Sequence, residues 1–342
     1  MASSILHFPS SHVVVTGGAG FIGSHLVERL LTDGHRVVVI DDLSTGRLKN
    51  LGTVRRHPGF RLIKAKVSKC PGLDRLMSRT GFIFHLAATV GVELVVKSPI
   101  RVIETNLLET EAVLKAAAPY RVPMLLASTS EVYGKSRQPA FGEDDDLLIG
   151  PPGQSRWSYA CSKLMDEFLA LAYAREKSVP IIVARLFNTV GPRQTGRYGM
   201  VLPRFIAAAR QNKPLKVFGD GRQTRCFCSV HDTVEALVRL QKRGCDALGP
   251  ARKSAAKSPG PVFGQIFNVG STEEISMLAL ARLVVKTLDS KSKIHLVPYD
   301  QAYAPGFDDM RRRKPMVKKL ERLVNFRPRT TLREIIRLTA ES

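Results

Sequence analysis

The chain has 342 residues, of which 44% are hydrophobic, and a mean hydropathy of −0.05, which is typical of a globular protein and not of a disordered one. No apolar run approaches the roughly 18 residues that a membrane-spanning helix needs, and residues 1–12 show neither the basic start nor the length of a signal peptide. Five cysteines without regular spacing indicate a reducing compartment, so we expect a cytoplasmic protein.

The net charge of the chain is strongly positive, +22, with 52 lysines and arginines against 30 acids. Such an excess can mark nucleic-acid binding, but no nucleic-acid-binding motif accompanies it here. Scattered surface side chains, together with a few that hold an anionic substrate, account for the charge. We therefore expect no nucleic-acid partner and no membrane partner.

Apolar strand-like runs alternate with helical ones through the first half of the chain. A strand is expected at 12–17, a helix with 3.6-residue periodicity at 20–34, and a second strand at 36–42. Later strands are expected at 61–67, 82–88, 122–130 and 180–187. Short strands with helices between them predict an α/β fold, in which helices cover both faces of a parallel sheet.

The pattern loosens from about residue 190 into loops, short strands and helices such as one at 200–211. This change predicts a smaller C-terminal lobe. We divide the chain into residues 1–187 and residues 188–342, with an interleaved boundary. Residues 244–262 are rich in Gly, Pro, Ser, Ala and Lys and are expected to form an exposed loop.

The stretch VVVTGGAGFIGSHL (13–26) combines two overlapping glycine patterns. Gly18, Gly20 and Gly23 fit G-x-G-x-x-G, and Gly17 fits the variant G-x-x-G-x-x-G. A strand precedes the glycines and an amphipathic helix follows, which is the context that a dinucleotide pyrophosphate requires. The cofactor-binding residues predicted here are Gly17, Gly20, Phe21, Ile22 and Gly23.

Asp41 and Asp42 end the second expected strand. A carboxylate at this place can accept from both ribose hydroxyls and would repel a 2′-phosphate, which favours NAD over NADP. Arg47 follows closely, and an arginine can accommodate a 2′-phosphate. We predict NAD as the cofactor, with Asp41 on its ribose.

The stretch YACSK places Tyr159 and Lys163 four residues apart on an expected helix, hence on one face. A tyrosine with a pKa near 10 is a poor base at neutral pH, but a neighbouring ammonium stabilises the phenolate. Such pairs are common on ordinary helices. Its position downstream of the glycine loop makes this one a catalytic candidate. Cys161 points away from the pair and is expected in the core.

Together, the glycine loop, HLAA, STSEVYG, YACSK, RLFNTVGPRQ and GDGRQTR make residues 12–335 similar to the extended short-chain dehydrogenase/reductases, specifically the NAD-dependent nucleotide-sugar epimerase/dehydratase group. The resemblance implies a Rossmann-type doubly wound sheet that binds NAD tightly, a substrate-binding C-terminal lobe, a nucleotide-diphosphate sugar substrate and a homodimer. It implies transient oxidation at the sugar C4, with Thr129 and Tyr159 at the C4 hydroxyl and Tyr159 as the base. Lys163 would contact Tyr159 and the nicotinamide ribose, so that Tyr159 and Lys163 also count as cofactor-binding residues.

The resemblance also implies how the substrate is held. Asn188 and Arg225 would contact the diphosphate, which suits amide and forked cationic donors. Arg313 would reach the same region, and Ser130 would belong to the substrate site.

Two features depart from the family pattern. Lys66 and Val67 stand where an acidic residue usually contacts the adenine, which puts the cofactor affinity in doubt. The basic segment 244–262 has no counterpart that we can assign.

Once C4 is a ketone, the sugar can be reduced from its other face, lose water from C6, or lose a C6 carboxylate as carbon dioxide. Dehydration needs a further base, typically a glutamate, and decarboxylation needs the carboxylate to be positioned. Glu131 is therefore a catalytic candidate that separates these three outcomes. STSEVYG, which contains it, and Arg313, the arginine before KP, resemble UDP-glucuronate decarboxylases, whereas the segment HLAATVGV does not. We therefore favour a decarboxylase, ahead of a UDP-glucose-type 4-epimerase and then a 4,6-dehydratase.

Two other functions receive less support. Cys226, Cys228 and His231 lack a fourth ligand, so we expect no metal ion. A non-catalytic module that uses its basic charge to hold RNA is the remote alternative. The set Thr129, Tyr159 and Lys163 argues against it, because a binding module has no need of that set.

Overall fold

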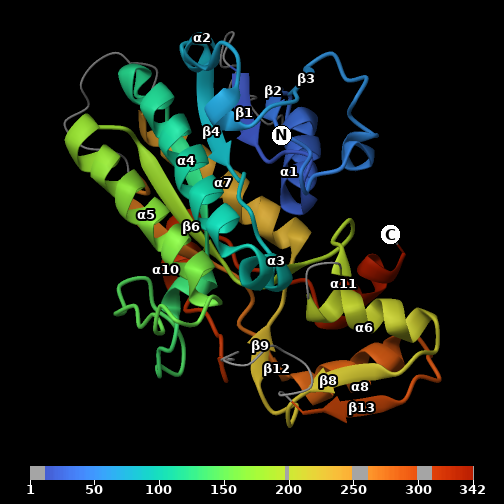
Figure 1. Ribbon diagram of the computed structural model, residues 1–342. Helices are drawn as coiled ribbons and strands as arrows, with labels where there is room; N and C mark the ends of the chain where they lie inside the picture. Colours follow the sequence, from blue (N-terminus) through green and yellow to red (C-terminus); the bar gives the residue numbers. More distant parts are fainter. Residues whose placement is uncertain (1–11, 197–199, 249–260, 299–309, 342) are drawn as a thin grey trace.

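The computed structural model describes residues 12–196, 200–248, 261–298 and 310–341 (Figure 1). Seven parallel strands form its central sheet, in the order β11-β6-β5-β4-β1-β2-β3. Their bounds are β1 His12–Thr16, β2 Arg36–Ile40, β3 Phe60–Ile63, β4 Thr80–His85, β5 Met124–Thr129, β6 Ile181–Leu186 and β11 Gln265–Val269. The predicted fold class, a Rossmann-type α/β sheet, is confirmed.

Helices cover both faces of this sheet (Figure 1). Their bounds are α1 Phe21–Thr32, α2 Leu73–Met77, α3 Val92–Lys97, α4 Pro99–Ala117, α5 Trp157–Lys177, α7 Val230–Leu248 and α10 Lys318–Val324. Side chains alternate along β1, so Val13 and Val15 pack in the core under α1 and α7, whereas Val14 packs in the core under α4 and α5. Apolar strands such as these are typical of a sheet that is buried on both faces.

The strand β11 is the one member of the main sheet that the sequence did not predict. It pairs with β6 at the sheet edge, although it comes from the second half of the chain. Its sequence, QIFNV, contains Asn268, which interrupts the apolar run. That side chain is fully buried, and its burial is compensated because it accepts a hydrogen bond from the Tyr133 hydroxyl, 2.7 Å away.

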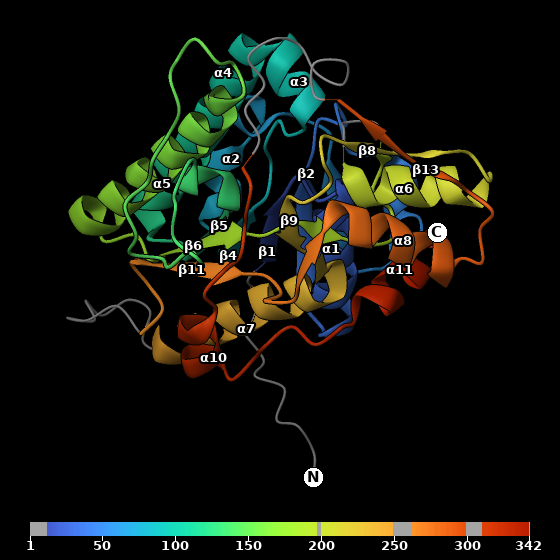
Figure 2. The ribbon, with the colours of Figure 1, turned by 90° about the horizontal axis from the view of Figure 1, so that it is seen from below.

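The C-terminal lobe lies to one side of the sheet, opposite α4 and α5 (Figure 2). Its helices are α6 Val201–Arg210, α8 Met277–Thr287 and α11 Leu332–Ala340, and its strand pairs are β8 Leu215–Phe218 with β13 Ile294–Val297, β9 Thr224–Cys226 with β12 Glu274–Ser276, and β7 Thr189–Val190 with β10 Cys228–Ser229. Phe205, Leu280 and Ile336 are buried in the lobe's own core. Of the basic segment 244–262, residues 249–260 lie outside the described residues.

Within the described residues, none of the helices combines the length and the apolar character that crossing a bilayer requires.

Candidate active site

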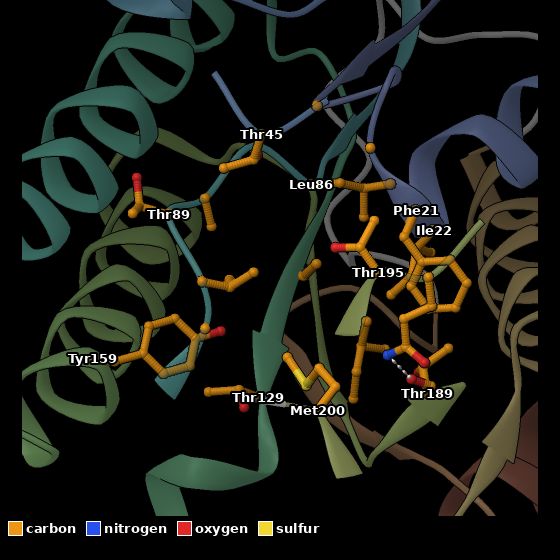
Figure 3. A pocket seen from close by; sticks show the side chains of 18 of the residues that line it. Phe21, Ile22, Thr45, Leu86, Thr89, Thr129, Tyr159, Thr189, Thr195 and Met200 are labelled. Atoms are coloured by element: carbon orange, nitrogen blue, oxygen red, sulfur yellow. Dashed lines mark hydrogen bonds between the residues drawn. The ribbon is translucent and has the colours of Figure 1, made fainter. Parts of the chain in front are cut away.

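A cavity of about 520 Å³ opens at the carboxyl ends of the parallel strands and continues toward the C-terminal lobe. The chain leaves β1 toward β2 on one side and β4 lies on the other, so this is the switch point at which doubly wound sheets bind ligands. Every residue that the sequence assigned to a site lines this cavity: Gly17, Gly20, Phe21, Ile22, Gly23, Asp41, Thr129, Ser130, Glu131, Tyr159, Lys163, Asn188, Arg225 and Arg313. Figure 3 shows several of them as they face the cavity.

The turn between β1 and α1 leaves no space for a side chain at Gly17 or Gly23. Gly17 has φ +70°, and a Cβ on it would lie 2.8 Å from the backbone nitrogen of Ala87. A Cβ on Gly23 would overlap the carbonyl oxygen of Gly17. The absence of side chains therefore lets the turn and the helix pack closely beside the cavity.

The N-terminus of α1 faces this cavity without a side-chain cap. Gly20 is the N-cap residue and Phe21 the first residue of the helix. The first backbone N–H groups of a helix carry a partial positive charge and have no partner within the helix. A cradle of this kind, free of side chains, fits the pyrophosphate of a dinucleotide.

Asp41 stands at the end of β2 and is held in place by the backbone. Its Oδ2 accepts from the N–H of Ala19 at 2.9 Å and its Oδ1 from the N–H of Leu43 at 2.8 Å. Burial raises the pKa of Asp41, and these two N–H groups oppose the rise. Arg47 and Lys66 line the cavity close by. The carboxylate and the glycine cradle together form a donor and acceptor set that fits NAD.

Tyr159 and Thr129 meet at the other end of the cavity, where α5 passes the end of β5 (Figure 3). Burial and the neighbouring Glu131 raise the pKa of Tyr159, while a hydrogen bond with the Thr129 hydroxyl favours its ionised form. As it stands, the phenol keeps its proton at neutral pH. It needs added positive charge before it can act as a base.

Lys163 is the expected source of that charge, and the structure pairs it with a residue that the sequence analysis missed. Its Nζ lies 2.7 Å from Oδ2 of Asp166, and both side chains are buried, at 2% and 0% exposure. The only sequence signal was the i, i+3 spacing along α5, which is shared by many pairs on helix surfaces.

Glu131, the residue that separates the three reaction outcomes, is paired with arginines. Its Oε1 lies 2.7 Å from Nη1 of Arg313 and its Oε2 3.5 Å from Nη2 of Arg156. Burial alone would raise the pKa of Glu131, but Arg313, then Arg156 and Arg225, hold it below the ordinary value. This glutamate is therefore ionised at neutral pH. The sequence analysis missed Arg156, because no motif surrounds it.

Hydrogen bonds between distant segments of the chain hold Arg313 in this place. The N–H of Phe141 donates to the carbonyl of Lys314 and the N–H of Met316 donates to the carbonyl of Phe141, each at 2.8 Å. The side-chain amide of Asn268 donates to the carbonyls of Phe141 and Met316. Segments more than 120 residues apart in the chain thus meet beside Glu131.

Asn188 and Arg225 line the part of the cavity nearer the C-terminal lobe. The Asn188 amide donates to the carbonyl of Cys226 at 2.9 Å, and the Arg225 guanidinium donates to the carbonyl of Thr224 at 2.7 Å. Two further lining residues that the sequence analysis missed are Arg193 and Arg204. Arg193 is paired with Glu28 at 2.7 Å, so Arg204 is the one of the two that adds positive charge beyond the motifs.

One expectation about α5 is wrong. Cys161 is exposed and does not lie in the core. A residue that points away from the face of Tyr159 and Lys163 points away from the sheet as well, because that face packs toward the cavity and the sheet.

The chain is similar to known proteins over almost all of its length. A model of the NAD dependent epimerase/dehydratase family matches residues 13–252. The UDP-N-acetyl-alpha-D-glucosaminuronate decarboxylase of Bacillus cytotoxicus is 38% identical over 329 residues, which cover 96% of each chain. The UDP-glucuronic acid decarboxylase 4 of Arabidopsis thaliana is 36% identical over 94% of this chain and 66% of that longer protein.

A solved structure has the same fold. It is UDP-glucuronic acid 4-epimerase from Bacillus cereus, in complex with UDP-glucuronic acid and NAD. It superposes with a TM-score of 0.81 at 27% identity, over 96% of this chain and 98% of that one.

Proposed function

Because the chain belongs to the NAD-dependent epimerase/dehydratase family, we propose that it is a decarboxylase of a UDP-hexuronate, of the UDP-glucuronate type. Relatives that are 38% and 36% identical carry names of such decarboxylases. The alternatives are a 4-epimerase and, after it, a 4,6-dehydratase. The structural neighbour that acts on UDP-glucuronic acid is a 4-epimerase, which makes a uronate epimerase the strongest form of the first alternative.

The family is NAD-dependent, and NAD, when bound, supplies the oxidising power at the sugar C4. We assign the pyrophosphate to the turn of Gly17, Gly20 and Gly23 with the N-terminus of α1, and the adenosine ribose to Asp41. Support for this assignment comes from the uncapped helix and from the space that is closed to side chains.

Tyr159 is the group that we propose to take the proton from the C4 hydroxyl. Thr129 hydrogen-bonds the phenol, and its hydroxyl can also form a hydrogen bond with the substrate oxygen. Lys163 supplies the positive charge that a phenolate requires.

The charge around Glu131 is the observation that carries the decarboxylase proposal. Two arginines, at positions 156 and 313, contact one carboxylate, Glu131, at the Tyr159 end of the cavity, and Arg225 acts on it from farther away. A C6 carboxylate is the group that forked guanidinium donors bind best, whereas a neutral hexose offers them hydroxyls only. A uronate therefore suits this arginine cluster better than a neutral sugar.

The chemistry follows from that fit. With C4 as a ketone, the C5–C6 bond breaks, its electron pair moves toward C4 as an enolate, and carbon dioxide leaves. C5 then takes a proton, and C4 is reduced again by the hydride that it gave up. We propose that Arg313 and Arg156 orient the carboxylate, that Ser130 contacts it, and that Glu131 fixes the arginines. Asn188 and Arg225 are proposed to hold the diphosphate.

Product masses test this proposal. The purified protein is incubated in separate reactions with UDP-glucuronate, UDP-N-acetylglucosaminuronate and UDP-glucose. Products from the two uronates that are lighter by one carbon dioxide support the decarboxylase. An unchanged mass with altered retention would establish the epimerase, and a loss of one water would establish the dehydratase. No turnover together with salt-sensitive RNA binding would establish the non-catalytic module.

We also propose that the protein is a homodimer. Ile100 and Leu108 on α4, and Met165 and Phe168 on α5, are large apolar side chains that are 53–72% exposed. These two helices lie side by side (Figure 1), and an apolar surface over both favours a partner. Sedimentation would show a dimer that Phe168→Glu converts to a monomer; a monomeric wild-type protein would exclude it.

A cytoplasmic location is likewise a proposal. All five cysteines are free thiols, which suits a reducing compartment.

A further inference from the structure

A buried carboxylate next to the catalytic helix face has no part in the chemistry described so far. Asp166 lies on α5, one turn beyond Lys163, and is 0% exposed. Its Oδ2 contacts the Lys163 ammonium at 2.7 Å. Its Oδ1 is buried and has no hydrogen-bond partner among the described residues.

The position of this carboxylate matters because its charge acts on Tyr159 as well as on Lys163. Burial, Glu131 and Asp166 raise the pKa of Tyr159, while Thr129 and Arg313 lower it. An ammonium near the phenol favours the phenolate, and a carboxylate near the phenol opposes it. Asp166 thus opposes the help that Lys163 is proposed to give.

We propose that Asp166 is a positioning residue: it holds the Lys163 ammonium and offsets its charge, so that Tyr159 releases its proton less readily than the Tyr159–Lys163 pair alone would. This inference rests on the proposed function, in which Tyr159 is the base.

The other charged groups near α5 do not have this relation to Lys163. His85, from β4, is fully buried beside Thr16 and stays neutral, because burial lowers its pKa to about 3. Arg185, from β6, is paired with Glu167 at 2.7 Å. From the loop after β5, Glu131 is paired with Arg313.

Two further elements, β5 and α4, pack against α5. Strand β5 has no titratable side chain. On α4, Glu109 accepts hydrogen bonds from Ser68. Within the described part of the chain, Asp166 is therefore the carboxylate that contacts Lys163.

The sign of the effect follows from the charge that the phenol acquires. Loss of its proton leaves a phenolate, and a neighbouring negative charge opposes that step. Removal of the charge of Asp166 must therefore bring the deprotonation of Tyr159 to a lower pH.

The experiment compares the Asp166→Asn enzyme with wild type, with bound NAD and UDP-glucuronate as substrate. We expect the acidic limb of the kcat/KM profile to move to lower pH by roughly one unit, which is about tenfold in relative kcat/KM on that limb. Asp166→Glu, which keeps the charge, should retain the wild-type limb. Glu167→Gln removes a buried carboxylate one residue further on, and should leave the limb in place.

A second measurement separates this inference from the proposed function. The ultraviolet absorbance of tyrosinate is titrated in the purified protein without substrate, and the signal of Tyr159 is obtained by difference from Tyr159→Phe. The Tyr159 transition should move to lower pH in Asp166→Asn, or in Asp166→Ala if the asparagine variant does not fold. A shift without uronate turnover would keep the inference and reject the function. An unchanged transition, or an equal shift in Glu167→Gln, would overturn the inference.

Discussion

The two ends of the cavity differ in the groups that line them. The end beside α1 consists of backbone: glycines at 17, 20 and 23, an uncapped helix, and one carboxylate that is held by two N–H groups. The end beside α5 consists of charged side chains in contact, Lys163 with Asp166 and Glu131 with Arg313 and Arg156. The first end can bind the same group in every reaction of the family.

The second end is where reactions can differ. Each of its charges depends on a partner, so a single substitution leaves a buried ion uncompensated. From this comparison we expect that cofactor binding changes when a side chain is added to the glycine turn. We expect that the outcome of the reaction changes when a charged side chain is removed. The predictions that follow separate these two responses.

The largest effect is expected at the charged end from Tyr159→Phe. Removal of the phenol oxygen removes the proposed base, and turnover should fall by about 10²–10⁴-fold. Bound NAD, measured after denaturation, should be unchanged, because the glycine end is intact. Turnover close to wild type would remove Tyr159 from the mechanism.

Arg313→Met should lower kcat/KM for UDP-glucuronate by about 10²–10³-fold, or about 3–4 kcal/mol, because it removes one partner of the substrate carboxylate and the nearer arginine partner of Glu131. The double variant Glu131→Gln/Arg313→Met removes both charges. Its free energy of unfolding should exceed that of Arg313→Met. If the free energies of unfolding lost in the two single variants add up to the loss in the double variant, the 2.7 Å contact between Glu131 and Arg313 does not contribute to stability.

At the backbone end, Gly23→Ala should lower the free energy of unfolding by about 1–3 kcal/mol, since its Cβ would overlap the Gly17 carbonyl. The bound NAD should fall with it. Gly153→Ala is the matched control, because a Cβ there meets nothing within 4 Å. Equal melting temperatures for the two variants would contradict a closed turn.

The smallest effect concerns acid stability. The pKa of Glu131 lies below the ordinary value of 4.5 because the three arginines outweigh burial, so its ion pairs stabilise the fold above that pH. This stabilisation is lost as the pH falls through the lowered pKa. The difference in melting temperature between wild type and Glu131→Gln should therefore shrink under acid. A difference that is constant with pH would show that Glu131 does not titrate in this range.

The two ends of the cavity also differ in how far they could be predicted from the sequence. The backbone end was predictable, because Gly17, Gly20 and Gly23 are contiguous and their spacing reflects one local turn. Thr129, Tyr159 and Lys163 were found through local motifs as well. Asp166 and Arg156 were not, because an acid on a helix and an arginine before one are ordinary features until tertiary contacts place them.

Strand β11 illustrates the same limit for the fold. Its five residues contain Asn268 and lie far from β6 in the chain, so neither periodicity nor proximity marked them. The exposure of Cys161 was also beyond the local pattern, since helical spacing fixes which residues share a face but not which face meets the sheet.

The central claim is that the arginines beside Tyr159 select a uronate, whose carboxylate is then lost. The most direct test follows UDP-glucuronate labelled with carbon-13 at C6. We predict that the label leaves as carbon dioxide in wild type, with far slower release in Arg313→Met. Label that stays in the nucleotide sugar while UDP-glucuronate is converted to another product would contradict the account.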